Sequence, residues 1–141
     1  MADLKSEKLK KRIIEEMTVD YSNALERNFD LAKQFIRVSK EGKIEVLLRE
    51  KLGGKEQILL YLIGKLYAKE AGFATTEEVG NKELMDELGV PKGSVLPWLM
   101  DLRDKKKIRA IKRGKGTNHV IPVNLIDRAL KDIEKSLKKR L

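Results

Sequence analysis

The chain has 141 residues, a formal net charge of +9 and 41% apolar side chains, which is enough for one folded domain with an appendage and too apolar for a disordered chain. It contains no cysteine, so disulfides and thiol chemistry are excluded and a reducing, cytoplasmic setting is expected. No run reaches the roughly 20 apolar residues of a membrane helix, and the first residues lack the apolar centre of a signal peptide. Charged side chains make up 38% of the chain, a bias typical of thermophiles.

Residues 1–52 are predicted to form a helical extension followed by a small hairpin. Apolar residues at spacings of three and four predict a helix over residues 4–34, with a candidate break near residues 18–20. Two alternatives stay open for this helix, which either pairs with a second copy or packs on its own domain. After it, the run FIRV-SKEG-KIEVLL predicts a hairpin that turns at Gly42. A stripe that is typical of a coiled-coil seam runs along the helix through Ile14, Met17, Tyr21, Ala24, Asn28 and Phe35.

Residues 53–123 are predicted to contain three helices, the last two in close succession, and then a hairpin. A wide apolar face predicts the first helix over residues 54–71. Asn81 is a plausible N-cap for the next helix, Gly89 ends it, and Pro91 suits the opening of the one that follows. The runs IRAIKR and HVIPV then flank a glycine-containing turn and predict a hairpin. The apolar positions of the two later helices are Leu84, Leu88, Val90, Val95, Trp98, Leu99 and Leu102.

This apolar skeleton, followed by the hairpin, resembles the winged helix-turn-helix domain of transcription regulators, of an archaeal or thermophile type. The resemblance covers roughly residues 54–123. It implies an α+β, mostly α fold in which the second motif helix enters the major groove of DNA. It also implies that the hairpin, called the wing, touches the DNA backbone or minor groove.

The positive charge is concentrated in the last part of the chain. Residues 1–53 carry a net charge of +2, residues 54–104 a net charge of −3, and residues 105–141 a net charge of +10. A one-sign run on a hairpin favours a polyanion as partner, so we expect double-stranded DNA and a nucleoid-associated protein. RNA stays open as an alternative, although the predicted hairpin face has no aromatic side chain on which bases could stack. The predicted DNA-binding residues are Lys92, Ser94, Lys105, Lys106, Lys107, Arg109, Lys112, Arg113 and Lys115.

The second motif helix is an unusual reader of bases. Its predicted outer stripe is formed by Gly93, Pro97, Met100, Asp101 and Asp104, whereas a major-groove helix ordinarily offers Arg, Lys, Asn or Gln. We therefore expect the hairpin to be the main contact with DNA, in a regulator or chromatin-associated protein that acts as a homodimer. The alternative is an adaptor that binds a protein partner through the face of Pro97, Met100 and Asp101.

Residues 124–141 are predicted to form a basic amphipathic helix that packs on the domain or pairs with a second copy, and membrane binding is not expected. No enzyme function, metal or cofactor is expected either, because metal-ligand spacings are absent from the sequence. The turn GKGTN lacks the strand–loop–helix setting of a phosphate loop. The single histidine, His119, is expected on the surface of the hairpin.

Overall fold

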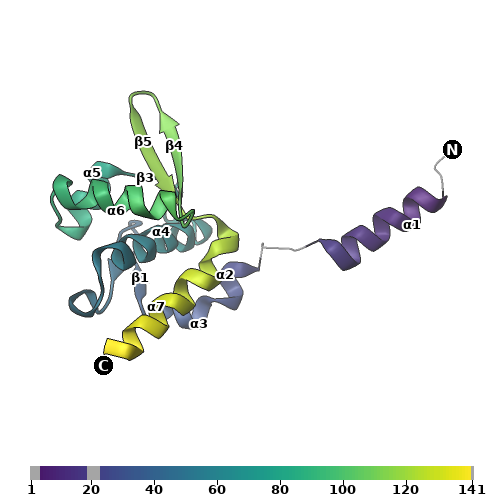
Figure 1. Ribbon diagram of the computed structural model, residues 1–141, viewed down its shortest axis with the longest axis horizontal. Helices are drawn as coiled ribbons and strands as arrows, with labels where there is room; N and C mark the ends of the chain where they lie inside the picture. The colour runs from purple at the N-terminus through teal and green to yellow at the C-terminus, as the bar shows by residue number, and fades with distance from the viewer. Residues whose placement is uncertain (1–3, 19–22, 141) are drawn as a thin grey trace.

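The computed structural model describes residues 4–18 and 23–140. The fold is α+β and mostly helical, with two small antiparallel sheets. A helical arm at the N-terminus precedes a body from which one long hairpin projects (Figure 1). None of the described helices has the length and apolarity needed to span a membrane.

Helix α4 (Gly54–Glu70) is the centre of the body. It is buried nearly all round, as expected for a helix whose apolar residues are not confined to one stripe. On one side it packs against strands β1 (Ile36–Val38) and β2 (Ile44–Val46), and on others against α6 (Lys92–Asp104) and α7 (Ile126–Arg140). The predicted helix over residues 54–71 is therefore confirmed.

Two glycines allow these close approaches. A Cβ at Gly64 would lie 2.4 Å from Cγ2 of Ile44, and a Cβ at Gly54 would lie 2.4 Å from the ring of Trp98. A side chain at either position would force the β-hairpin or the indole away from α4, at a typical cost of about 1–3 kcal/mol for overpacking.

Helices α5 (Asn81–Leu88) and α6 form the predicted two-helix motif. Leu84, Val95, Leu99 and Leu102 are almost fully buried, and Gly89 ends α5 with a positive φ of 65°. This part of the prediction is confirmed. The predicted N-cap is wrong, because the cap residue is Gly80 and Asn81 is the first residue of the helix.

The second sheet joins segments that are distant in sequence. Its strand order is β3 (Val79–Gly80), β5 (Gly116–Val120) and β4 (Arg109–Arg113), all antiparallel. The hairpin β4–β5, called here the basic hairpin, closes through the two residues Gly114 and Lys115. It stands out from the end of α6 (Figure 1).

The predicted helix over residues 4–34 is interrupted, first at Thr18, the start of the candidate break, and again at Asn28, where no break was predicted. Residues 19 and 20 of the candidate break lie outside the described residues. Helix α1 (Leu4–Arg12) continues as a π-helical turn, η1 (Ile13–Met17), and ends where Thr18 turns extended. The chain then forms two short helices, α2 (Ala24–Arg27) and α3 (Phe29–Lys33), which are separated at Asn28.

The predicted coiled-coil seam is broken for the same reason. Ile14 and Met17 are exposed on the arm, whereas Ala24, Asn28 and Phe35 are buried in the body; Tyr21 lies outside the described residues. The buried Asn28 amide donates a hydrogen bond to the Ala24 carbonyl at 2.8 Å. Asn28 therefore ends a helical turn within its own chain, and these residues do not form one continuous face.

The predicted hairpin over residues 35–48 is shorter than expected. Strands β1 and β2 turn at Gly42, whose φ is 82°, and Ile44 and Val46 point into the core. Leu48 leaves this face because it adopts a left-handed conformation before the short 3-10 helix η2 (Arg49–Lys51).

The C-terminal helix packs on the body. After a 3-10 turn, η3 (Val123–Leu125), α7 buries Ile126, Leu130, Ile133 and Leu137 against α4 and α2. Its end is held by Arg140, which donates to Glu56 Oε1 at 2.5 Å. Of the two alternatives for this helix, the structure shows packing on the chain's own domain.

Candidate nucleic-acid interface

The basic hairpin exposes cations on both of its faces. Arg109, the half-buried Ile111 and Arg113 occupy every second position of β4, so the three side chains lie on one face of the strand. Lys112 lies on the other face opposite Thr117, and Lys115 lies in the two-residue loop. Positive charge therefore extends along the whole hairpin to its end.

Most of the predicted contact residues have no anionic partner in the part of the chain that the structure describes. Among the described residues, six of them form no ion pair, and all six are exposed. These residues are Lys92, Lys106, Lys107, Arg109, Lys112 and Lys115. An exposed, unneutralised set of this kind can exchange its counter-ions for phosphates.

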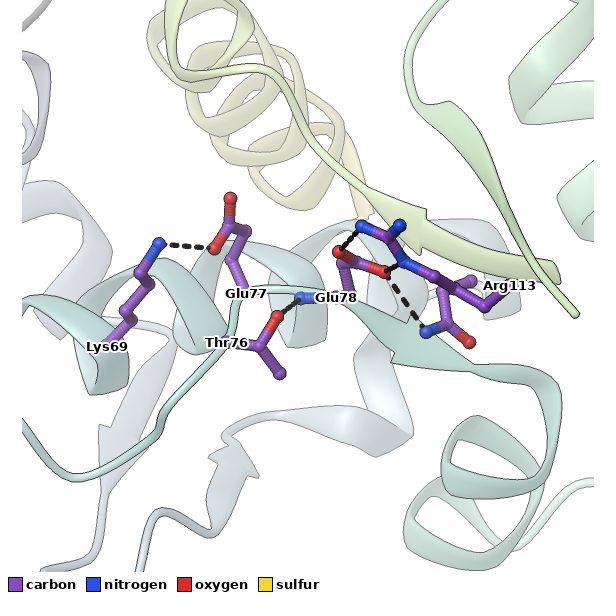
Figure 2. A network of polar contacts seen from close by, with 6 residues as sticks. Lys69, Thr76, Glu77, Glu78 and Arg113 are labelled. Atoms are coloured by element: carbon purple, nitrogen blue, oxygen red, sulfur yellow. Dashed lines mark hydrogen bonds and ion pairs between the residues drawn. The ribbon is translucent and has the colours of Figure 1, made fainter.

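Arg113 differs from its neighbours because it is engaged inside the protein. Its guanidinium donates to both carboxylate oxygens of Glu78, at 2.8 and 2.5 Å, and Asn118 donates to the same carboxylate at 3.2 Å (Figure 2). These bonds, chiefly those from Arg113, hold the pKa of Glu78 down at about 2. Arg113 therefore fastens the hairpin to the segment before β3, and its charge is largely neutralised.

A second carboxylate is neutralised on α6. Asp101 Oδ2 lies 2.7 Å from Lys55 Nζ and 3.1 Å from Lys105 Nζ, and the hydrogen bonds from these lysines lower the pKa of Asp101. Asp101 faces α4, so its prediction as part of the outward stripe is wrong. Gly93, Pro97, Met100 and Asp104 are exposed as predicted.

The start of α6 contributes a smaller patch. Lys92 is exposed at its first turn, and Ser94 is half-buried behind it. The unpaired backbone N–H groups of a helix start favour anions. This patch lies at the opposite end of α6 from Lys105 and the basic hairpin, so the two parts of the predicted site are separated by the length of that helix.

His119 is not a surface residue, which corrects the expectation from the sequence. It is 2% exposed and pairs with both Val79 and Ala110 in the middle of the sheet. Its Nε2 lies 2.7 Å from Asn81 Oδ1, while the buried Nδ1 has no partner among the described residues. Burial, with a smaller contribution from the charge of Arg103, lowers the pKa of His119 to about 4.

Three residues that shape this site were not singled out from the sequence. Glu78 and Lys55 neutralise Arg113 and Asp101, and Asn118 helps to hold Glu78. Their partners are more than 30 residues away, so local spacing gave no signal for them. The alternation of β5 does place Asn118 opposite Ile111, on the face that carries Arg113.

Comparison of the chain with known protein families, curated proteins and solved structures found no match.

Proposed function

We propose that residues 53–123 form a winged helix-turn-helix domain and that the protein binds duplex DNA mainly through its basic hairpin. The order α4–β3–α5–α6–β4–β5 supports the first part, because one sheet joins the strand before the two-helix motif to the hairpin after it. The role is that of a transcription regulator or a chromatin-associated protein of the nucleoid.

The observation that carries the DNA proposal is a set of six exposed cations that form no ion pair among the described residues. Five of them lie between Lys106 and Lys115, and Lys92 lies at the other end of α6. Two nearby carboxylates are neutralised, that of Asp101 by Lys55 and Lys105 and that of Glu78 by Arg113. Repulsion of phosphates by these two carboxylates is thereby reduced. The surface offers few base-reading donors, so binding rests on phosphate contacts and is weakly selective for sequence.

The salt dependence of binding to a random duplex tests this proposal. If the six cations each neutralise one phosphate, the slope of log K against log salt is roughly −5. Fluorescence anisotropy with a labelled duplex over a series of salt concentrations measures it. A slope near zero, or no binding at low salt, would contradict the proposal.

Binding of a protein partner is a second candidate function, favoured by one observation. Met100 is 57% exposed on α6, next to the exposed Pro97. The substitution Met100→Lys distinguishes the two functions. For a DNA-binding protein we expect unchanged or slightly tighter affinity for duplex DNA, whereas for an adaptor we expect loss of a stoichiometric partner from nuclease-treated extract.

A further inference from the structure

The N-terminal arm (residues 4–17, α1 and η1) exposes apolar side chains that the described part of the body does not cover. Exposed fractions are 73% for Leu4, 58% for Leu9, 42% for Ile13, 57% for Ile14 and 76% for Met17, and no residue of the arm is buried. Five large apolar side chains exposed within 14 residues are typical of an interaction site. Figure 1 shows the arm running away from the body.

The body carries an apolar groove, called here the α3 groove, of about 790 Å³. Phe29 lies in it, 50% exposed, with its ring edge-on to Tyr67 at a centroid distance of 6.4 Å. The groove is lined by Asn23, Leu25, Glu26, Phe29, Asp30, Ala32, Lys33, Ile36, Arg37, Val38, Tyr67, Glu70 and Ala71.

The charges of the two surfaces are complementary. The last turn of α1 carries three cations, Lys10, Lys11 and Arg12, and Arg12 Nε lies 3.4 Å from Glu16 Oε2 on the same arm. Three carboxylates edge the α3 groove, and within the described part of the chain none of them forms an ion pair. These carboxylates belong to Glu26, Asp30 and Glu70. Two cations, Lys33 and Arg37, also line the groove, and Lys33 Nζ lies 5.5 Å from the centre of the Phe29 ring. The lining therefore has a net charge of −1, with three carboxylates against two cations, and the arm has a net charge of +2, with five cations against three carboxylates.

We propose that the arm of one copy lies in the α3 groove of a second copy and that two copies exchange arms about a twofold axis. Thr18 is extended, with φ −83° and ψ 125°, and the arm leaves its own body rather than folding back on it. Such exchange of one element is a low-cost route to a dimer. Each copy would contribute 14 arm residues and 13 groove residues, within the roughly 20–30 residues a side of a stable interface.

Two full-length variants with opposite defects test the exchange. The arm variant places carboxylates on the apolar positions of the arm and carries Leu9→Glu, Ile13→Glu and Met17→Glu. The groove variant places two guanidinium groups at exposed positions of the groove and carries Phe29→Arg and Ala71→Arg. We expect the unmodified protein to be a dimer by size-exclusion chromatography with light scattering, and each variant alone to be a monomer. An equimolar mixture should recover a dimer, because one intact arm meets one intact groove, with weaker affinity than the unmodified pair.

Other outcomes would overturn the proposal. A monomeric unmodified protein excludes the dimer, and an arm variant that stays dimeric excludes the arm. A groove variant that stays dimeric indicates that arms pair with each other and not with grooves. A mixture that stays monomeric shows that an intact arm and an intact groove do not hold two copies together. Phe73→Arg, at an exposed phenylalanine outside the groove, is the control and should remain a dimer. The readout involves no DNA, so the result is independent of the proposed function.

Discussion

Replacing Arg109, Lys112 and Lys115 together with glutamate is expected to abolish binding to duplex DNA while leaving the fold intact. All three side chains are exposed and none is ion-paired within the described residues, so their loss removes no internal contact. The change turns three attractions to phosphate into three repulsions. In the milder glutamine triple, the salt slope should become shallower by about 2.7 because three counter-ions fewer are released.

A matched control separates this effect from net charge. Lys40, Lys43 and Lys51 are exposed on the first hairpin and the turn after it, and their change to glutamate alters the net charge equally. We expect this control to retain most of the DNA affinity, whereas equal losses in both triples would show that only overall charge matters. Circular dichroism melts check that all variants are folded.

Acidification is expected to destabilise the protein through one buried side chain. The pKa of His119 is about 4 in the folded chain, against an ordinary value of 6.5. Since the unfolded chain takes up the proton first, the stabilising contribution is fully present above pH 6.5 and is lost as the pH falls from there to about 4. The whole difference corresponds to roughly 3 kcal/mol in the free energy of unfolding.

The geometry explains why the neutral imidazole is favoured. Nε2 carries the proton and donates to Asn81, so a second proton on Nδ1 would be buried without an acceptor among the described residues. Because His119 is the only histidine in the chain, its Cε1–H resonance can be followed by NMR without ambiguity. We expect its midpoint near pH 4 in the folded protein and near 6.5 in urea. A folded-state midpoint above pH 6 would contradict this account.

The parts of the fold that were predictable have local causes. Leu84, Gly89 and Val95 define two helices and the break between them within 12 residues, and the Gly114–Lys115 turn lies between two apolar-rich runs. Helical spacing, a positive φ and strand alternation each depend on neighbouring residues only. The short strand β3 could not be found this way. Its two residues, Val79 and Gly80, form a strand only because they pair with His119 and Asn118, which are distant in sequence.

The candidate site was predictable in composition but not in which charges are neutralised. Lys112 and Arg113 look equivalent in the sequence, yet only Arg113 meets a carboxylate, 35 residues away. The sequence predicts that the charge of Asp101 faces outward and repels phosphates, but Lys55, which is distant in sequence, lies beside its carboxylate. The continuous helix through Asn28 failed for a similar reason, since the spacing of apolar residues gives no sign that Asn28 is buried and bonds back to Ala24.

The position of β5 has a consequence for the mechanics of the basic hairpin. An isolated two-stranded hairpin is only marginally ordered in water, whereas β5 is the middle strand between β4 and β3 and is pinned at His119. The basic hairpin is therefore more ordered than an isolated hairpin, because β5 is attached through β3 and His119 to the start of α5. Under the proposed DNA binding, a hairpin that is already ordered loses little conformational entropy on association.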